Sequence, residues 1–574
     1  MKTVLPLYTP LPSPEEMRQW DEAAHTVFGI PPLLLMENAA QAAFSVLKEH
    51  CPLSPESRIL IFMGRGNNGG DGAALARLLH DAGHSVLVCL AGPLEALSGP
   101  AGEHADMAQK MGVSFLPISS DEFPVLPLDW RFPDVVVDAV TGTGIKGDLR
   151  ERELSLVRTI NVLSKKAYVC SLDIPSGLCG YTGKPRPEAV HANLTVTFEA
   201  GKPGLYFPEA REFTGMVVVR RVGIPLAVRT MLFPSWQLLD PQPGTWAEPP
   251  LLQHKGNAGK VLIIGGSEGM AGAPLLAALG SLRAGAGLVH VAIPAALEPA
   301  VRSFCPELLV HPVGRGAHWE DADAPALLAL MRTISPDALV LGPGMGRSAA
   351  TRLIVQTVLE EKERAPVLVD ADALYFFRLP DPTTGSISGQ FRTDALPSSG
   401  EAAEIRASLS LDLFTEKDVL TPHPGEMARM LPCSFFPENA GNPQTDGGTP
   451  ERTLRSCIDV LQEDRAGALR AFTRTCKAVM VLKGPGTLIG RHNATTVLCP
   501  IAAPALAVGG SGDVLAGVCA AVIASGAYTL DATCLAVYLH GRAGELLSGQ
   551  APRGHLARDI ADAIPLAWKE LCEK

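Results

Sequence analysis

An aspartate near the end of the chain stands in a glycine-rich stretch, Gly509-Gly510-Ser511-Gly512-Asp513. The apolar run that follows predicts a helix, so backbone N–H groups of this stretch would converge at a helix N-terminus. Such donors can hold a phosphoryl group during transfer, and the Asp513 carboxylate could take the proton of an attacking hydroxyl. The alternative for Asp513 is an ordinary helix cap.

Two further glycine-rich stretches of the second half have the composition of a nucleotide site. Lys483-Gly484-Pro485-Gly486-Thr487 follows a predicted strand, and Gly342-Pro343-Gly344-Met345-Gly346 follows another. The chain contains no G-x-x-x-x-G-K-[ST] segment, which excludes a P-loop enzyme. We therefore expect the nucleotide to be bound by these loops and by the helix N-terminus at Gly512.

A histidine and a pair of carboxylates add polar groups to the same half. His423 lies between two prolines in Thr-Pro-His-Pro-Gly-Glu, where rigid turns favour a ligand contact over a purely structural role. Asp370 and Asp372 follow a predicted strand at 367–369. These carboxylates could bind magnesium or cap a helix, and the sequence leaves both alternatives open.

In the first half, the segment Gly64-Arg65-Gly66-Asn67-Asn68-Gly69-Gly70-Asp71-Gly72 follows a predicted strand and opens a helix. It contains G-x-G-x-x-G, the pattern of a dinucleotide-binding loop. Such a site also needs an acidic residue about 20 positions further on, whereas the next strand ends in Cys89-Leu90-Ala91-Gly92. This excludes an ordinary NAD-dependent dehydrogenase. A glycine turn that only packs helix against strand is the alternative to a binding site.

Two more polar loops, DAVTGTGIKGD from Asp138 and LDIPSG from Leu172, each follow a predicted strand. Because the carboxyl ends of parallel strands face one crevice, we expect the three loops to meet there. Asn68, Asp138 and Ser176 would offer oxygen atoms suited to a hard cation, although each singly could be a cap or turn residue. Asp173 is the titratable candidate for acid–base chemistry.

Alternating strands and helices must position these loops. Ser13-Pro14-Glu15-Glu16 is a capping box that predicts a helix start, and a second helix is expected from Pro31-Pro32 to about His50. Continuous apolar runs predict strands buried on both faces, and their alternation with helices predicts α/β domains with mostly parallel sheets. The predicted strands are residues 58–63, 85–90, 134–140, 168–172, 194–198, 216–220, 260–264, 287–293, 338–341, 367–369 and 479–482.

At 574 residues the chain is too long for one hydrophobic core, so two or more domains are expected. A proline-rich stretch, residues 231–253, predicts a linker between domains at 1–230 and 254–574. Residues 379–410 and 433–452 are rich in Pro, Gly, Ser and Thr, and they predict surface insertions.

Charge and targeting features exclude several classes of protein. The net charge of −11 argues against nucleic-acid and anionic-membrane binding. Prolines interrupt the N-terminal apolar stretch, and the longest apolar run, 514–528, is too short for a membrane span, so we expect neither a signal peptide nor a membrane segment. Twelve cysteines without a C-x-x-C pair predict neither a zinc site nor a disulfide framework and favour the cytoplasm.

The motifs GRGNNGGDG, DAVTGTGIKGD and LDIPSG resemble those of the NAD(P)H-hydrate epimerases, the YjeF N-terminal type of domain, over roughly residues 10–225. The resemblance implies a Rossmann-like α/β/α sandwich that interconverts the R and S epimers of hydrated NADH and NADPH, through ring opening or transient loss of hydroxide. It also implies a potassium ion (K+) held by Asn68, Asp138 and Ser176. The implied hydrate contacts are Asn67, Asn68, Gly69, Gly70, Asp71, Gly142, Thr143, Gly144, Ile145, Lys146, Gly147, Asp148 and Asp173.

The second half, about residues 250–574, is similar to the ribokinase-like NAD(P)H-hydrate dehydratases. HKGNAGKVLIIGGS, GPGMG, DADAL, TPHPGE, KGPGT and GGSGDVLAG carry this resemblance. It implies that the ring hydroxyl attacks the terminal phosphoryl group of ADP (generally in bacterial members) or ATP (in eukaryotic ones) with Mg2+, and that phosphate then leaves to restore the dihydronicotinamide. The implied hydrate contacts are Ala273, Gly344, His423 and Asp513, and the implied nucleotide contacts are Lys483, Gly484, Pro485, Gly486, Thr487 and Gly512.

Together the halves resemble the bifunctional NAD(P)H-hydrate repair enzymes, whose partners are small-molecule substrates, and we expect a homo-oligomer. Two other functions stay open. One is a ribokinase-like kinase that phosphorylates a small alcohol and releases a stable product. In the other, the first half is a binding module without catalytic activity. Absence of the four site residues would indicate such a module, but all of them are present: Asn68, Asp138, Asp173 and Ser176.

Overall fold

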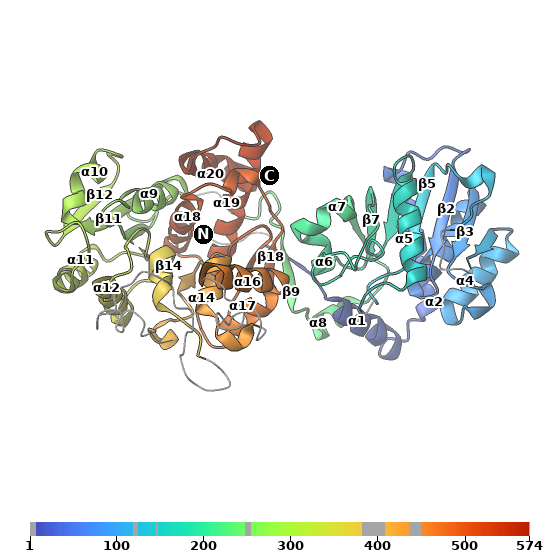
Figure 1. Cartoon of the computed structure of the whole chain (residues 1–574), viewed down its shortest axis with the longest axis horizontal. Coiled ribbons are helices and arrows are strands. Elements are labelled where there is room, and N and C mark those ends of the chain that lie inside the picture. Colours follow the sequence, from blue (N-terminus) through green and yellow to red (C-terminus); the bar gives the residue numbers. More distant parts are fainter. Residues whose placement is uncertain are drawn as a thin grey trace. The chain divides into compact units, whose positions relative to one another are not determined.

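Two compact α/β units make up the chain (Figure 1). The N-terminal unit consists of residues 10–237, and the C-terminal unit joins residues 7–9 to residues 238–572. Each unit contains a mainly parallel sheet with helices between successive strands, so the predicted α/β fold is confirmed. No helix of the described residues is long and apolar enough to cross a membrane. The computed structural model describes residues 7–118, 124–144, 147–246, 254–380, 408–436 and 450–572.

The N-terminal unit is built on a seven-stranded parallel sheet. In spatial order its strands are β4 (Ser114–Pro117), β3 (Ser85–Leu90), β2 (Arg58–Met63), β5 (Val135–Ala139), β6 (Tyr168–Leu172), β7 (Leu194–Phe198) and β8 (Met216–Arg220). The order reverses between β2 and β5, where Phe62 is the register partner of Asp138. In open α/β sheets the ligand crevice lies outside the carboxyl ends of the strands at such a reversal.

Helices cover both faces of this sheet; they include α2 (Pro32–His50), α3 (Asn67–Asp81), α4 (Gly99–Lys110) and α5 (Glu151–Leu163). Ile59 and Ile61 of β2 pack in one core with α2, α3 and α4. Leu60 and Phe62 pack in a second core with α5. Because successive strand residues point to opposite faces, an unbroken apolar strand needs both helical layers.

The predicted capping box begins helix α1 (Pro14–Thr26). Ser13 Oγ accepts a hydrogen bond from the Glu16 backbone N–H at 3.3 Å, and a Glu16 carboxylate oxygen accepts one from the Ser13 N–H at 2.7 Å. Trp20 on the same helix is fully buried and donates Nε1–H to the carbonyl oxygen of Leu232 at 2.8 Å. These contacts fix α1 to the C-terminal end of its own unit.

The C-terminal unit contains an eleven-stranded sheet. In spatial order its strands are β1 (Tyr8–Pro10), β9 (Trp236–Leu239), β18 (Thr496–Cys499), β17 (Thr487–Gly490), β16 (Val479–Leu482), β15 (Val419–Leu420), β14 (Val367–Val369), β13 (Ala338–Leu341), β10 (Lys260–Ile264), β11 (Leu288–Pro294) and β12 (Leu309–Val313). The strands from β16 to β12 run parallel, whereas β17 and β18 are antiparallel. The order reverses between β10 and β13, which places a second crevice there.

One face of this sheet is covered by α9 (Gly272–Arg283), α18 (Ser511–Ala524), α19 (Thr529–Gln550) and α20 (Ala557–Cys572), which Figure 1 labels. Val261 and Ile263 of β10 belong to this core, whereas Leu262, equally buried, faces the other side. Helices α9 and α18 approach closely, because a Cβ on Gly517 would lie 1.8 Å from the carbonyl oxygen of Ala277. A glycine is therefore required at this helix crossing.

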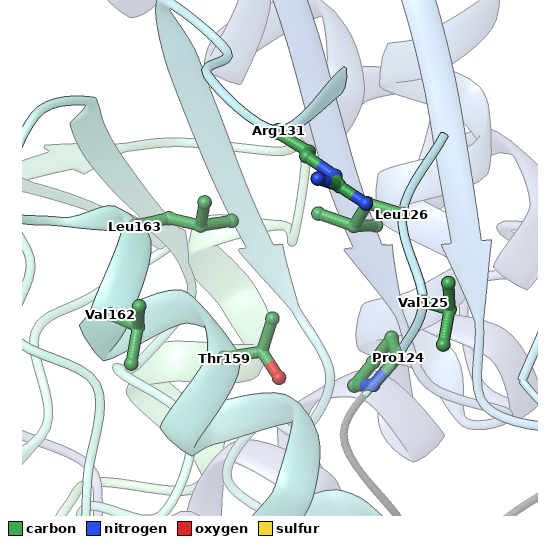
Figure 2. A pocket seen from close by; sticks show the side chains of 7 residues that line it. All are labelled: Pro124, Val125, Leu126, Arg131, Thr159, Val162 and Leu163. Atoms are coloured by element: carbon green, nitrogen blue, oxygen red, sulfur yellow. The ribbon is translucent and has the colours of Figure 1, made fainter. Parts of the chain in front are cut away.

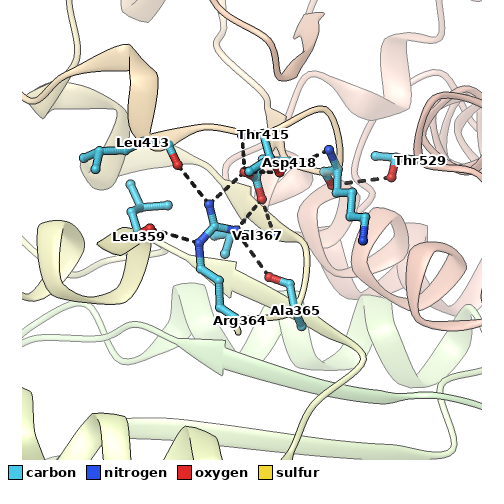
Figure 3. Close-up of polar contacts among 9 residues, drawn as sticks. Leu359, Arg364, Ala365, Val367, Leu413, Thr415, Asp418 and Thr529 are labelled. Carbon is cyan, nitrogen blue, oxygen red and sulfur yellow. Dashed lines mark hydrogen bonds and ion pairs between the residues drawn. The ribbon is translucent and has the colours of Figure 1, made fainter. Parts of the chain in front are cut away.

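A buried ion pair joins the start of β14 to the loop before β15 (Figure 3). Arg364 donates to both carboxylate oxygens of Asp418, at 2.6 and 2.8 Å, and the two side chains are 6% and 0% exposed. Asp418 also accepts from the backbone N–H groups of Val367 and Thr415, and Arg364 donates to the carbonyl of Leu413. A buried ion pair needs hydrogen-bond partners for its remaining polar atoms, and these bonds hold the two strands in alignment.

Several short strands were not predicted. β15 has two residues, and β12 contains both a histidine and a proline, so neither forms an apolar run. The stretch at 231–253, expected as a linker, contains β9, whereas residues 247–253 lie outside the described part. Most of the expected insertions, residues 381–407 and 437–449, also lie outside it.

Candidate active sites

The carboxylate of Asp138, at the end of β5, organises the crevice of the N-terminal unit. It is fully buried and accepts hydrogen bonds from Ser176 Oγ at 2.5 Å, Ser176 N at 2.8 Å and Ser171 Oγ at 2.8 Å. Burial raises the pKa of Asp138, and the hydrogen bonds from Ser176 and Ser171 oppose that shift. The carboxylate thus ties the end of β5 to the loop that follows β6.

Asn68 and Ser176 meet at the loop after β5. Asn68 Nδ2 donates to the carbonyl oxygen of Thr141 at 3.0 Å, and Ser176 Oγ accepts from the Thr141 N–H at 2.8 Å. Asn68 Oδ1 and Thr141 Oγ1 are buried and have no hydrogen-bond partner among the described residues. Unsatisfied buried oxygens are costly, and together with Asp138 they fit a hard cation. No cluster of three His, Cys, Asp or Glu residues suited to a metal occurs in the described part of the chain.

Asp173 lies one residue beyond β6 with φ +63°, a left-handed conformation that is costly for a residue other than glycine. Its Oδ1 accepts a hydrogen bond from Lys202 Nζ at 2.5 Å, and Thr197 Oγ1 lies 3.4 Å away. A Cβ built on Gly142 would lie 3.3 Å from Asn68 Cβ and 3.4 Å from Asp173 Oδ2. The structure therefore brings Asn68, Gly142 and Asp173 together, as predicted from their loops.

Asp71, five residues into α3, interacts with the charges of the same crevice. Burial raises its pKa well above the ordinary value, the carboxylates of Asp173 and Asp21 raise it further, and Lys202 opposes the shift. Asp21 lies on α1, a helix that carried no predicted site residue. The crevice thus contains titratable carboxylates in unlike environments, which is a pattern of functional sites.

Other glycines of the first motif are needed for packing. A Cβ on Gly69 would lie 2.0 Å from the carbonyl oxygen of Gly64, and one on Gly70 would lie 2.5 Å from Met36 Sδ. The packing alternative therefore explains these two glycines, but not the buried Asn68. Of the other predicted hydrate contacts, Ile145 and Lys146 lie outside the described residues, Thr143 is half-buried, and the exposed ones are Asn67, Gly144, Gly147 and Asp148.

In the C-terminal unit, Ala273 and Gly344 meet at the second crevice. Gly344 has φ +66°, and a Cβ on it would lie 2.6 Å from the Met270 carbonyl oxygen and 3.2 Å from Ala273 Cβ. Ser267 Oγ donates to the carbonyl oxygen of Gly344 at 2.7 Å, which fixes the loop. The loops after β10 and β13 are therefore in direct contact, as the strand reversal requires.

A second group of candidate residues surrounds the end of β16. Lys483 Nζ donates to Asp370 Oδ1 at 2.8 Å, and Thr421 Oγ1 donates to the same oxygen at 2.8 Å. A Cβ on Gly512 would lie 3.2 Å from Lys483 Nζ. The loops after β14, β15 and β16 and the start of α18 thus meet around one ammonium group.

Asp513 lies on the first turn of α18. Burial, together with the charges of Asp370, Asp372 and Glu426 and against the opposing effect of Lys483, raises the pKa of Asp513 to about 7. A carboxylate with a pKa near neutrality can accept and release protons at physiological pH. Asp513 is therefore a candidate general base on the first turn of α18, whose N-cap residue is Gly510.

His423 has a structural role that was not expected. Its Nδ1 accepts the backbone N–H groups of Gly425 at 3.0 Å and Glu426 at 3.3 Å, capping α14 (Pro424–Met430). Burial lowers the pKa of His423 to about 4, and the charge of Lys483 lowers it further, so the ring is neutral. Only Nε2 is left to contact a ligand.

The two carboxylates after β14, Asp370 and Asp372, make different contacts. Asp372 accepts from the Gly346 N–H at 3.0 Å and from Arg347 Nε at 2.9 Å, so it holds the neighbouring glycine loop. The guanidinium of Arg347 stacks over Tyr375 at 5.0 Å. Asp370 Oδ1 is occupied by Lys483 and Thr421, whereas its Oδ2 accepts no hydrogen bond from a described residue.

Two positively charged residues next to these sites were missed. Arg465, on the first turn of α17 (Arg465–Thr473), donates to the carbonyls of Pro485 at 2.5 Å and Leu482 at 3.2 Å and so fixes the loop at Lys483. No local motif marks it. Lys202 could have been recognised, because its Lys-Pro-Gly follows a strand much as Lys-Gly-Pro-Gly does at Lys483.

Figure 2 shows a cavity of about 300 Å³ in the N-terminal unit, between α5 and the segment before β5. Its lining is mostly apolar and includes no predicted site residue, so we assign no chemistry to it. The lining residues are Pro124, Val125, Leu126, Arg131, Thr159, Val162 and Leu163.

Two protein-family models match the chain. The family described as YjeF-related protein N-terminus matches residues 33–204, and the family described as NAD(P)H-hydrate dehydratase matches residues 261–383 and 400–566. The second match omits residues 384–399, which lie within the predicted insertion at 379–410.

Curated relatives are similar over nearly their whole length. The bifunctional NAD(P)H-hydrate repair enzyme of Moorella thermoacetica is 32% identical and covers 97% of this chain and 96% of its own. That of Coxiella burnetii is 33% identical and covers 93% and 94%. Among solved structures, the ADP/ATP-dependent NAD(P)H-hydrate dehydratase of Bacillus subtilis, co-crystallised with ATP and Mg2+, is 27% identical over 57% of this chain and 94% of its own, with a TM-score of 0.41.

Proposed function

This chain belongs to the family of bifunctional NAD(P)H-hydrate repair enzymes, and from that membership we propose how its two units share the work. The chain is an NAD(P)H-hydrate epimerase and an NAD(P)H-hydrate dehydratase, as its motifs predicted, and neither the small-alcohol kinase nor the binding module is favoured. We assign epimerisation to residues 10–237 and dehydration to residues 238–572.

For the epimerase we propose Asp173 as the acid–base group, in contact with the hydrate. Asn68, Asp138 and Ser176 would hold potassium; when bound, the ion supplies a fixed positive charge. The buried, unpartnered Asn68 Oδ1 supports this assignment, and so does the contact of both Asn68 and Ser176 with Thr141, since Ser176 also bonds Asp138. The predicted hydrate contacts of the loops after β2 and β5 complete the site.

For the dehydratase we propose Asp513 as the base that takes the proton of the ring hydroxyl. The hydroxyl oxygen attacks the terminal phosphorus of the nucleotide, and the bond from that phosphorus to the bridging oxygen breaks. Phosphate then leaves with the electrons of its C–O bond, and loss of a proton from the neighbouring ring carbon restores the double bond. Phosphorylation thereby converts hydroxide into a better leaving group. Ala273, Gly344 and Nε2 of His423 would contact the hydrate.

We further propose that Lys483 to Thr487 and Gly512 bind ADP or ATP. The half-buried Lys483 ammonium and the backbone N–H groups at the start of α18 provide positive potential for a phosphate. Asp370 would hold Mg2+, which supplies charge neutralisation for the phosphate groups when bound. The Oδ2 atom of Asp370 accepts no hydrogen bond from a described residue, and a carboxylate oxygen is a suitable ligand for a hard cation. The Asp372 carboxylate instead accepts a hydrogen bond from Arg347.

One observation carries the proposal: in each unit, a lysine near the carboxyl ends of the strands hydrogen-bonds one carboxylate and interacts electrostatically with a second. In each unit one carboxylate of the two is proposed to transfer protons. The test is recovery of dihydronicotinamide absorbance from mixed R and S hydrates, with ADP and separately with ATP. Complete recovery of both epimers is expected. D173A should stop once the S epimer is spent, measured at short times so that spontaneous epimerisation can be subtracted. Recovery of the S epimer alone by the unaltered chain would contradict the epimerase assignment.

We also propose a cytoplasmic homo-oligomer. NADH and NADPH are made and used inside cells, which supports the compartment. Two apolar side chains that line the cavity of Figure 2 are largely exposed, Val125 at 85% and Val162 at 60%, which supports association with a second copy. Light scattering on the purified chain tests this, and a monomer at all concentrations would contradict it.

A further inference from the structure

Lys202 is a buried cation at the epimerase site. Its side chain is 1% exposed, and lysine is almost never fully buried unless it is paired. Its Nζ donates to Asp173 Oδ1 at 2.5 Å, Thr197 Oγ1 at 2.9 Å and the carbonyl oxygen of Phe198 at 3.0 Å. All three hydrogens of the ammonium are thus used, and Asp173 is its one charged hydrogen-bond partner in the described part of the chain.

The backbone directs Asp173 towards this lysine. Asp173 and Glu199 each lie one residue beyond a strand, with φ +63° and +62°. Glu199 pairs with Arg229 and accepts the backbone N–H of Val222 at 2.9 Å. Because Arg229 already neutralises Glu199, the charge of Lys202 is available to Asp173.

Other carboxylates face this ion pair without touching the ammonium. Asp71 approaches from α3 and Asp21 from α1, and both interact electrostatically with Asp173 and Lys202. Loss of hydration raises the pKa of Asp21, the charges of Asp173 and Glu199 add to the increase, and Lys202 opposes it. The Lys202 ammonium therefore contacts Asp173 and not Asp71, and burial raises the pKa of Asp71, which favours its neutral form.

Either route of epimerisation needs one proton acceptor and one donor. In ring opening, a base removes the hydroxyl proton while an acid protonates the ring nitrogen. In hydroxide loss, an acid protonates the departing hydroxyl, and a base deprotonates the water that returns. A carboxylate that is hydrogen-bonded to an ammonium and a second, buried carboxylate whose pKa is raised can take these two roles.

We propose that Lys202 is a positioning residue of the epimerase, which holds Asp173 as the proton acceptor and leaves Asp71 as the proton donor. This inference rests on the proposed role of Asp173. Lys202 has no donor left for the hydrate, since all three are used within the protein, and Asp173 is the one carboxylate to which it hydrogen-bonds in the described part of the chain.

The test uses the full chain with K202M and K202R. Epimerase kcat/KM is measured against pH from the conversion of R hydrate, and dehydratase activity on S hydrate verifies the concentration of folded enzyme. Removing the cation should move the acid limb of the K202M profile upward by about 1–3 pH units, with about a tenfold or greater loss on the acid side of that limb that recovers at higher pH. K202R retains the positive charge, so the acid limb of its profile should lie at the same pH as in the unaltered chain. K110M, on an exposed lysine of the same unit, is the control and should change nothing.

An unchanged limb in K202M, or an equal loss at every pH, would overturn the inference. If K202M shows no unfolding transition of the N-terminal unit, it is not folded, and D71N is used in its place. The epimerase pH profile of D71N should lose its decline at high pH, and an unaltered profile would overturn the assignment of Asp71 as the proton donor. D173N separates the two proposals. Full epimerase activity in D173N would refute the role of Asp173 itself, whereas an inactive D173N with a normal K202M refutes the inference alone.

Discussion

The ammonium of Lys483 lies 2.8 Å from Asp370 Oδ1, the oxygen that also accepts the hydroxyl of Thr421. Burial alone would lower the pKa of Lys483, but Asp370, Glu426 and Asp513 outweigh it and raise the pKa. The lysine therefore stays charged at the dehydratase site. A fixed cation there both attracts phosphate and favours the ionised form of Asp513.

The first prediction concerns Asp513. D513N should lower dehydratase kcat by about 10²- to 10⁴-fold, because the amide cannot accept the hydroxyl proton. Epimerase activity should be unchanged, since it belongs to the other unit. The rate of absorbance recovery from S hydrate with ADP measures the loss. D562N, on an exposed aspartate paired with Arg283, is the matched control. Normal turnover by D513N would exclude Asp513 as the base.

The second prediction is a pH dependence. As a base, Asp513 must be ionised, and its pKa is raised by burial to about 7. Dehydratase kcat/KM should therefore rise with pH through about 7 and then level off. K483M should move the midpoint upward, because Lys483 opposes the increase in this pKa. Rate profiles on S hydrate at saturating nucleotide check both statements. A midpoint that stays in place in K483M would contradict the electrostatic link.

The sequence located the site loops because each follows an apolar strand, and parallel strands place their carboxyl ends together. Asp173 and Asp513 could thus be predicted from local motifs. The Lys-Pro-Gly stretch after a strand could have indicated Lys202, but its contact with Asp173 depends on the packing of the whole sheet. No local motif marks Arg465, whose bond to Pro485 likewise depends on the three-dimensional fold. His423 was predicted as a ligand contact because nothing local shows that its Nδ1 caps a helix.

The third prediction concerns the pair in Figure 3. R364M should destabilise the C-terminal unit by about 3–5 kcal/mol, because it leaves the Asp418 carboxylate buried and unpaired. Urea unfolding, followed through the transition of that unit, measures the effect. R332M removes an ion pair with Glu361 in which the arginine is 68% exposed, and it should cost less than about 1 kcal/mol. Equal effects of the two variants would mean that burial of the pair is unimportant.

The fourth prediction concerns potassium. N68A removes the unpartnered amide oxygen and should reduce epimerase activity and its response to K+ together. The measurement compares R-hydrate conversion in potassium chloride and in tetramethylammonium chloride at equal ionic strength. The unaltered chain should be faster in potassium, and N68A should respond little. Dehydration of S hydrate by the same samples controls for general salt effects. A full potassium response in N68A would place the ion elsewhere.

The last prediction links His540 to acid stability. Burial lowers the pKa of His540 to about 4, and its Nε2 lies 3.0 Å from the carbonyl oxygen of Ser511. In the unfolded chain a histidine has a pKa of about 6.5. Between these values the unfolded chain binds more protons, so the C-terminal unit should lose stability as the pH falls from about 6.5 towards 4.

H540Q removes this titration while keeping a side-chain amide near Ser511. From urea unfolding at pH about 7.5 and about 5, the loss of stability on acidification should be smaller in H540Q than in the unaltered chain, by on the order of 2 kcal/mol. His290, whose pKa burial also lowers to about 4, contributes equally to both proteins and cancels. H318Q, on a histidine that is 65% exposed, should follow the unaltered chain. Parallel losses in H540Q and H318Q would show that the buried neutral imidazole does not control the acid response of this unit.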